Sequence, residues 1–457
     1  MSQANQKRAT LNLDALHEKI AAGEIDTVVT VFPDTYGRLM GKRLGAEFFL
    51  ASYEHGTHGC NYLLTVNIEM DPLPGFKLAS WEQGYGDFAL VPDMNSLRLL
   101  PWQQGAAMVI CDVHHHDGTL VSEAPRSVLR RQLERLAGDA LTCNIASELE
   151  FFLFEQSYRD AFAAGYTGLK PSSDYRIDYE TMQTAGAEPI MRQLRRQMGP
   201  AGIPVESTKG EWGRGQHEAN FVYSNPLSMA DGHVAFKQGA KEIAAQHGKS
   251  ITFMPKVFAD EAGNSCHIHI SLCRDGRNIF WDSQKNEPAA AFRHFLGGLM
   301  RYSRELCYFF APTINAYKRY QPDSWAPTKM VWAEDNRTTG FRIVGDGQSF
   351  RIENRLPGGD ANPYLAFAAM LVAGMAGIEE QLDCGEAYHG NAYVDAALPA
   401  LPTTLRDAAD LLGASALARR AFGDEVIDFY VHTARHEATA FAAGVTDWER
   451  LRYFERI

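Results

Sequence analysis

Runs of β-branched and other apolar residues, bounded by polar turns, predict several short strands in the first part of this chain. Residues 26–44 form two such runs, separated by a turn around Pro33, Asp34 and Gly37. A third run, 107–113, is followed at once by a polar turn. The pattern therefore predicts a strand-rich N-terminal part.

The periodicity changes near residue 120, which predicts a domain boundary. Residues 125–138 repeat apolar positions at helical spacing and end at Gly138, as expected for a helix. Beyond this point predicted strands and helices mix. We therefore predict an α/β protein with one domain over 1–120 and a second over 121–457.

Two further helices are predicted in the second domain. One covers 231–247, with Asp231 as its N-cap and Gly248 as its end. The other begins at the Asn-Pro pair 362–363, which suits an N-cap and first helical position. The apolar run 364–378 that follows is shorter than the roughly 20 residues of a membrane span, so we expect a buried core helix.

Composition narrows the possible classes of function. Asp and Glu outnumber Lys and Arg by 56 to 44, a net charge of −12. This surplus argues against nucleic-acid binding, which needs a basic surface, and against attachment to anionic membranes. The first 20 residues lack the apolar run of an export signal, and the seven cysteines form no C-x-x-C pair. We expect a cytoplasmic protein with reduced thiols.

Candidate chemistry is concentrated in strands with charges at alternate positions. Glu148 and Glu150 lie in the strand-like run 147–154, where residues two apart share a face. Two carboxylates beside apolar neighbours would repel each other, and a divalent cation would relieve that repulsion. His267 and His269 repeat the same spacing between isoleucines. Acids and imidazoles on shared faces therefore indicate a possible metal site.

Two more segments add charge of the same kind. Arg351, Glu353 and Arg355 alternate along one predicted strand, and Glu211 and Glu218 flank a Gly-rich bend. One such segment could be a solvated strand face, but four argue against that, because unpaired charge on central strands is unfavourable. Oxygen-rich ligation with an imidazole favours Mg²⁺ or Mn²⁺ over zinc. Arginines beside such a metal indicate a polyphosphate substrate, although no Walker or dinucleotide motif is present.

Taken in order, these segments resemble the glutamine synthetase family. The resemblance runs from about Asp34 to Glu449. It rests on Asp34-x-x-Gly37, Pro125-Arg126, Glu148-x-Glu150-Phe151-Phe152, Glu211 with Gly215-Gln216-x-Glu218, His267-x-His269, Asn315-x-Tyr317-Lys318-Arg319, Ala326-Pro327, Arg351-Ile352-Glu353-x-Arg355 and Asn362-Pro363-Tyr364. The resemblance implies an N-terminal β-grasp domain and a C-terminal catalytic domain on a curved antiparallel sheet. It also implies a homododecamer with active sites shared between subunits.

The resemblance assigns roles to individual residues of this chain. One metal would be held by Glu150, Glu211 and Glu218. A second metal would be held by Glu148, His267 and Glu353. ATP would contact His269, Arg337, Arg342 and Arg351, with Arg337 also acting on the transferred phosphoryl group. Glutamate would be bound by Gly263, Arg319 and Arg355.

The chemistry implied by the resemblance has two steps. The γ-carboxylate of L-glutamate attacks the γ-phosphorus of ATP, and an amine then attacks the resulting γ-glutamyl phosphate. Metals and arginines would neutralise charge on the phosphoryl group. A closing loop would shield the acyl phosphate from water.

The chain departs from the family pattern at the ammonia pocket. Ammonia-using members carry a Glu before the Ala-Pro of the closing loop, where this chain has Trp325. Tryptophan has no charge to attract ammonium and cannot act as a base. The stretch 59–64 also lacks the family's ammonium-binding Asp motif, although Asp87, supplied by an adjacent subunit, would lie near the site. We therefore predict an organic primary amine as acceptor: a polyamine, ethanolamine or another monoamine packed against Trp325.

Two alternatives remain open from the sequence. An acid from elsewhere could replace the lost Glu, in which case the protein would be an ammonia-using glutamine synthetase. The protein could instead be a catalytically silent member with a structural role. The silent alternative predicts damage to the metal ligands, whereas all six candidates are present.

Overall fold

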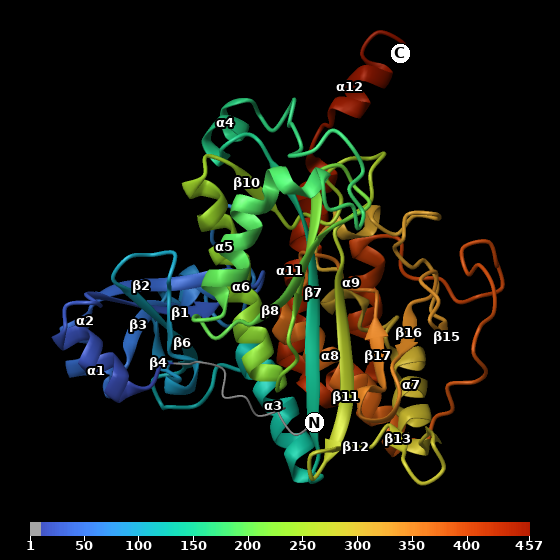
Figure 1. The fold of residues 1–457 in the computed structure, drawn as a ribbon, viewed down its shortest axis with the longest axis horizontal. Helices are drawn as coiled ribbons and strands as arrows, with labels where there is room; N and C mark the ends of the chain where they lie inside the picture. The colour runs from blue at the N-terminus through green and yellow to red at the C-terminus, as the bar shows by residue number, and fades with distance from the viewer. Residues whose placement is uncertain (1–10) are drawn as a thin grey trace.

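Figure 1 shows a computed structural model, which describes residues 11–457. Residues 1–10, half of the stretch from which we predicted the absence of an export signal, lie outside the described residues. Across residues 11–457, no helix combines the length and apolar character needed to cross a bilayer. All seven cysteines lie in this part and are free thiols, as predicted.

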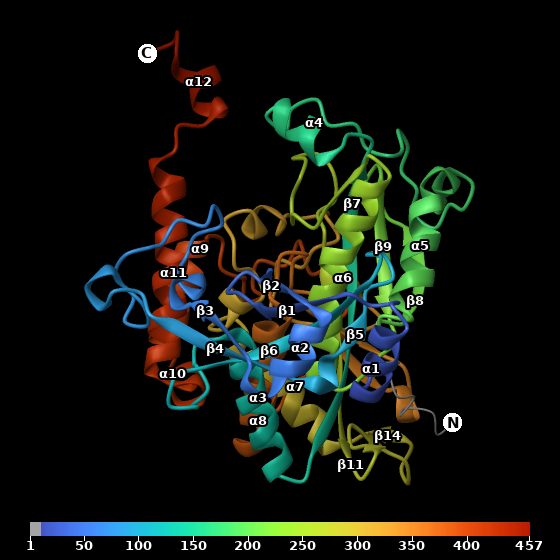
Figure 2. The same ribbon diagram turned by 90° about the vertical axis from the view of Figure 1, so that its left-hand side faces the viewer.

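The N-terminal part forms a six-stranded mixed sheet in the order β2-β1-β6-β4-β3, with β5 paired to β6. The predicted hairpin is present, because β1 and β2 are antiparallel and joined by a turn around Asp34. The bounds are β1 (Thr27–Pro33), β2 (Leu39–Gly45), β3 (Thr57–Cys60), β4 (Asp87–Pro92), β5 (Arg98–Leu99) and β6 (Ala106–His114). Helices α1 (Leu13–Ala21) and α2 (Ala46–Ser52) flank this sheet, as Figure 2 shows.

A nine-stranded curved sheet dominates the rest of the chain, in the order β15-β16-β17-β11-β7-β9-β8, with β10 and β12 at its margins. All its pairs are antiparallel except β15 with β16, which are parallel. The bounds are β7 (Thr142–Phe154), β8 (Val205–Gly210), β9 (Gln216–Phe221), β10 (Ser250–Thr252), β11 (Cys266–Arg274), β12 (Arg277–Asn278), β15 (Trp332–Glu334), β16 (Phe341–Val344) and β17 (Arg351–Asn354). The predicted α/β class and curved sheet are confirmed. The division at residue 120 stays a prediction; that position falls between β6 and α3 (Pro125–Gly138).

The central strand β7 separates two chemically different faces. Glu148 and Glu150 point to one face, whereas Leu149 is buried on the other. Ser147, on Leu149's side, contacts His233 of helix α6 (Pro226–Gln246) through Oγ and Nδ1 at 3.2 Å. The helices thus pack on the face of the sheet that carries Leu149, whereas Glu148 and Glu150 lie on the opposite face.

Helix α8 (Pro363–Glu379) is the predicted core helix, and the side chain of Asn362 caps it. It lies in the hydrophobic core against α3, α6 and α7. The Asn362 amide also donates to the carbonyl oxygens of Asp34 and Thr35, at 3.1 and 3.2 Å. This residue therefore links the core helix to the hairpin of the N-terminal sheet.

The predicted start of the helix at 231 was wrong. Helix α6 covers Pro226–Gln246, and Asn225 caps it by accepting from the Ser228 amide at 2.9 Å. Asp231 lies inside the helix, where it pairs with the buried guanidinium of Arg126 at 2.9 Å. An Asn-Pro pair outside the apolar-periodic stretch supplied the true start.

The remaining elements complete the outer layer around the sheet. Figure 2 shows α12, at the C-terminus, extending away from the body beyond α11. The bounds are α4 (Tyr158–Ala163), α5 (Glu188–Met198), α7 (Ala290–Tyr302), α9 (Leu405–Ala414), α10 (Ala416–Phe422), α11 (Asp424–Ala443) and α12 (Asp447–Tyr453), with a small ribbon of β13 (Trp281–Asp282) and β14 (Glu287–Pro288).

Candidate active site

A cavity of about 1110 Å³ lies on the charged face of the large sheet. Its walls come largely from alternate positions of six strands, β7, β8, β9, β11, β16 and β17, so the shared faces predicted from the sequence converge in one place. The predicted residues that line it are Glu148, Glu150, Glu211, Glu218, His267, His269, Trp325, Arg337, Arg342, Arg351, Glu353 and Arg355. Gly263, Arg319 and Asp87 are not among its lining residues.

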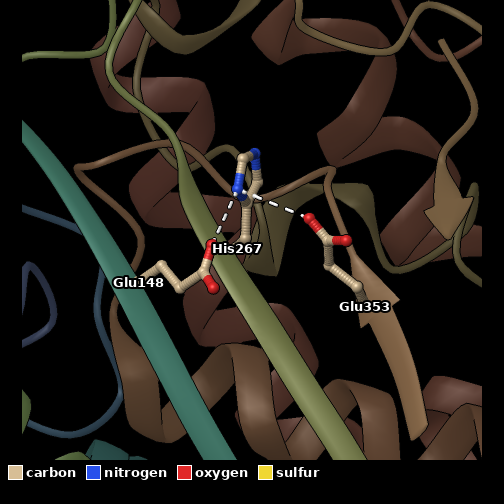
Figure 3. Close-up of side chains that lie close together, drawn as sticks. All are labelled: Glu148, His267 and Glu353. Atoms are coloured by element: carbon tan, nitrogen blue, oxygen red, sulfur yellow. Dashed lines mark hydrogen bonds and ion pairs between the residues drawn. The ribbon is translucent and has the colours of Figure 1, made fainter. Parts of the chain in front are cut away.

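Glu148, His267 and Glu353 form the first of two groups of potential metal ligands in this cavity (Figure 3). They come from β7, β11 and β17, which are neighbours in the sheet. His267 Nδ1 lies 3.3 Å from Glu148 Oε2 and 3.6 Å from Glu353 Oε1. The three residues are those that the resemblance assigned to one metal.

Glu150 and Glu218 form the second group, again with His267. The pairing of β7 with β9 sets Glu150 directly opposite Glu218. One ligand atom from each of the three residues lies within 4.8 Å of the others. His267 therefore stands between two clusters of carboxylates.

Arginines compensate the first group. Glu353 accepts hydrogen bonds from Arg355 at 2.7 Å and Arg342 at 2.8 Å. Burial alone would raise the pKa of Glu353, but Arg355 and the nearby histidines lower it to about 2. Burial lowers the pKa of His267 to about 4, so its imidazole is neutral and available as a ligand.

The second group lacks comparable compensation. Burial, followed by repulsion from Glu211, raises the pKa of Glu150 to about 7. Burial and the neighbouring carboxylates of Glu148 and Glu211 raise the pKa of Glu218 well above its ordinary value. Buried carboxylates with raised pKa values are typical of sites that receive a cation.

The donor set fits a divalent cation. Nε2 of His267 is buried and has no hydrogen-bond partner among the described residues, and neutral imidazole is a metal ligand. The other donors are carboxylate oxygens, which hard cations such as Mg²⁺ and Mn²⁺ prefer. A cation held by Glu148, Glu150, Glu218, His267 and Glu353 would neutralise the phosphate charge of a bound nucleotide.

Glu211 does not join either group, which differs from its predicted role. Its carboxylate forms an ion pair with Lys209 of β8. The same ammonium lies 3.9 Å from Glu218 Oε1 and 3.8 Å from Asp178 Oδ1. Partial burial opposes ionisation of this lysine, but Glu218 and Glu211 raise its pKa above the ordinary value, so it stays charged.

The predicted nucleotide contacts line the cavity around the first group. Arg351 Nε donates to His269 Nδ1 at 3.2 Å, and His269 Nε2 donates to Glu148 Oε1 at 2.9 Å. Arg337 and Arg342 lie on the neighbouring segment that contains β15 and β16. Three guanidiniums thus face the cavity where phosphates would meet the metal ligands.

Of the three predicted glutamate-binding residues, Arg355 lines the cavity, whereas Gly263 and Arg319 do not. Arg319 is fully buried, and its guanidinium donates to Ser265 Oγ and to the carbonyls of Leu356 and Arg355, each at 2.9 Å. A Cβ at Gly263 would lie 2.4 Å from the backbone carbonyl oxygen of Pro255 and 2.9 Å from the Arg319 side chain, so only glycine fits there. A substrate carboxylate would have to replace one of the partners of Arg319.

Trp325 stands at one end of the cavity, half-exposed and in a left-handed conformation with φ of +65°. Its ring meets that of Trp212 edge to face, with centroids 5.6 Å apart. A second cavity of about 720 Å³ lies behind these two rings, which line both spaces. Asp87, by contrast, is exposed at the start of β4 and does not line either cavity within one chain.

Sequence reasoning assigned no role to many residues that line the cavity, among them Lys209, Trp212, Asp178 and Tyr179. Lys209 precedes Glu211 by two positions, so the alternation rule used for the other strands would have placed both on one face. Nothing in the pattern around 178–179 marks a site, because that segment is an irregular loop.

The family description "Glutamine synthetase, catalytic domain" matches residues 122–453. The chain is 51% identical over 449 residues to the γ-glutamylethanolamide synthetase GlnA4 of Streptomyces coelicolor, covering 98% of this chain and 96% of that protein. It is 35% identical over 466 residues to a glutamate–isopropylamine ligase of a Pseudomonas species, covering 100% of both. A solved GmaS/ADP complex superimposes with a TM-score of 0.84 at 28% identity, covering 96% of this chain and 99% of that one. The chain belongs to the glutamine synthetase family.

Proposed function

We propose that this protein is an ATP-dependent ligase that joins the γ-carboxyl group of L-glutamate to an organic primary amine. One observation carries the proposal: a complete carboxylate–imidazole cluster and three arginines share a cavity whose end is closed by Trp325. The cluster supports phosphoryl transfer, and the tryptophan replaces the acid that ammonia-using members carry.

The proposed reaction has two steps. Glutamate and ATP give γ-glutamyl phosphate and ADP; the amine nitrogen then bonds to the acyl carbon, phosphate leaves, and a proton is released. Arg337, Arg342 and Arg351 would bind the phosphates, and His269 would contact the nucleotide. Arg355 and Arg319, with the Gly263 backbone, would hold the glutamate carboxylates.

Glu211 keeps its proposed place as a metal ligand if it exchanges its ion pair with Lys209 for a bound cation. Mg²⁺ or Mn²⁺ fits the oxygen-rich donor set. The presence of all six candidate ligands in or beside the two groups supports an active enzyme over a silent structural protein.

The relatives support a small organic amine as acceptor. One is named for γ-glutamylethanolamide synthesis and another for ligation of isopropylamine. Both acceptors named there are primary amines with short tails, which would pack against Trp325. Ethanolamine is therefore the first acceptor to test.

We also propose the assembly that the family resemblance implies. In a homododecamer, Asp87 of one subunit would approach the cavity of its neighbour, which is consistent with its distance from the cavity in a single chain. The division into domains at 1–120 and 121–457 and a cytoplasmic location belong to the same proposal.

The test is ATP turnover with glutamate, Mg²⁺ and a panel of ethanolamine, isopropylamine, a diamine and ammonia. We expect ADP and the γ-glutamyl amide in equal amounts, with an organic amine giving the highest kcat/KM. Ammonia as the best acceptor would make the protein a glutamine synthetase in the strict sense. Absence of turnover with every acceptor would support the silent alternative.

Trp325→Glu tests the amine end directly. The change removes aromatic packing and adds a carboxylate that attracts ammonium, so the preference for ethanolamine over ammonia should fall at least tenfold, about 1.4 kcal/mol. Trp325→Phe keeps an aromatic ring and is the matched control. The measurement is kcat/KM for both acceptors at saturating ATP and glutamate, and an unchanged preference in Trp325→Glu would exclude a role for this residue.

A further inference from the structure

Lys209 is a cavity residue with no role in the proposed chemistry. Its side chain leaves β8 toward the cavity, and its ammonium pairs with Glu211. Asp178 and Glu218 lie just beyond direct contact, at 3.8 and 3.9 Å. The ring of Tyr179 covers the ammonium, with its centroid 4.5 Å from Nζ.

These surroundings are those expected of a binding site for an alkylammonium ion. Carboxylates supply opposite charge, and an aromatic face adds a cation–π contact. The chain fills this position with its own lysine. A substrate ammonium that reached the same place would meet a fixed charge of its own sign.

Lys209 lines the same cavity as Trp325, the residue proposed to pack on the amine, and as Trp212, whose ring contacts Trp325. The guanidinium of Arg176 stacks over the Trp212 ring, 4.6 Å from its centroid. The amine end therefore combines apolar rings with bound positive charges.

We infer that Lys209 is a specificity-determining residue that selects primary amines with an uncharged tail and rejects diamines and polyamines. The inference rests on the proposed function and narrows its substrate class. A neutral tail can pack on Trp212 and Trp325, whereas a second ammonium in the tail is repelled by Lys209.

Two acceptors of equal length separate charge from size. 4-Amino-1-butanol and 1,4-diaminobutane differ only in a terminal hydroxyl or ammonium. With saturating ATP, glutamate and Mg²⁺, we expect kcat/KM of the wild-type protein to favour the amino alcohol at least tenfold. Lys209→Met and Lys209→Gln remove the charge and should reduce this ratio at least tenfold.

Two variants serve as controls. Lys209→Arg keeps the positive charge and should keep the preference for the amino alcohol. Lys249→Gln removes a lysine that pairs with Glu155 away from the cavity and should change neither rate. The ratio of two acceptors, measured on the same preparation, cancels any general loss of activity.

The outcomes separate this inference from the proposed function. Failure to ligate any amine would overturn the proposed function. Robust ligation with equal or better use of 1,4-diaminobutane by the wild-type protein would overturn the role of Lys209 and leave the proposed function intact. An unchanged ratio of kcat/KM for the two acceptors in both Lys209→Met and Lys209→Gln would also overturn the role of Lys209 and leave the proposed function intact. If both neutral variants are inactive, a loss of preference in Lys209→Arg overturns the inference and a retained preference supports it.

Discussion

The two carboxylate groups of the cavity share His267 but differ in what surrounds them. Glu353, in the first group, is held between Arg342 and Arg355, and its pKa is lowered to about 2. Glu150, in the second group, accepts hydrogen bonds from the Ser265 amide and Gln216 but forms no ion pair within residues 11–457, and burial raises its pKa to about 7.

This difference separates a role in stability from a role in binding. The first group is already neutralised by the protein, so its charges belong to the folded structure. The second group holds carboxylates that are buried close together and repel each other. This arrangement is unfavourable until a cation binds. Binding energy is therefore concentrated at the second group, where glutamate and the transferred phosphoryl group would meet the metal.

Glu353→Gln should give the largest effect. The change leaves the buried guanidinium of Arg355 without its anion and removes one of the two anions of Arg342. Breaking a buried pair costs about 3–5 kcal/mol of unfolding free energy. We expect a loss near 3 kcal/mol, because the amide oxygen still accepts one hydrogen bond, together with at least a hundredfold loss of activity. Denaturant unfolding of the metal-free protein at fixed concentration measures the first effect, and ADP release measures the second.

Asp335→Asn is the matched control for that variant. Asp335 pairs with Arg342 on its exposed side, where a salt bridge contributes about 0–1 kcal/mol. A change below 1 kcal/mol is expected. If Glu353→Gln is as mild as the control, the arginines do not make the first group part of the folded structure.

Glu218→Gln should act in the opposite direction on the metal-free protein. Removing one of several repelling buried carboxylates should raise the unfolding free energy by about 1 kcal/mol. The same change removes a ligand, so stabilisation by Mg²⁺ should shrink. In the wild type, a metal concentration one hundred times Kd should add about 2.7 kcal/mol. Thermal unfolding with and without Mg²⁺ measures both, and an undiminished Mg²⁺ effect in the variant would contradict the assignment.

Local sequence patterns predicted much of this site, because the alternation of side chains depends only on strand geometry. Alternation placed Glu148 with Glu150 and His267 with His269, and the sheet confirms both pairs on one face. The register that sets Glu353 opposite His269 and Glu218 opposite Glu150 depends on contacts far apart in the chain. Periodicity cannot supply that register; the family resemblance did.

The sequence did not predict which partners several charged side chains would pair with. The sequence identified Glu211 and Arg319 but not the ion pair of Glu211 with Lys209, nor the burial of Arg319 under the cavity. Asp231 was predicted as a helix cap because acids favour that position, whereas tertiary pairing with Arg126 places it inside α6. Electrostatic pairing across the fold overrides such local preferences.

The most gradual effect expected is a pH dependence of the unfolding free energy that belongs to the second group. Glu150 has a folded pKa of about 7, above the value of about 4.3 for an unperturbed glutamate. Between these values the folded protein binds a proton that the unfolded chain does not, so this stabilisation is lost as pH rises toward 7. The slope is about 1.4 kcal/mol per pH unit at most.

Glu150→Gln isolates that slope from the other titrating groups. The difference in unfolding free energy between wild type and variant, both metal-free, should grow in favour of the variant as pH rises from 5 to about 7, and then level off. Glu353 has its pKa near 2, so Glu353→Gln should show no such change across the same range. Parallel curves for wild type and Glu150→Gln would mean that Glu150 is compensated as well as Glu353, and the contrast between the two groups would not hold. A slope confined to Glu150 would show that the fold leaves this charge to be balanced by a bound cation.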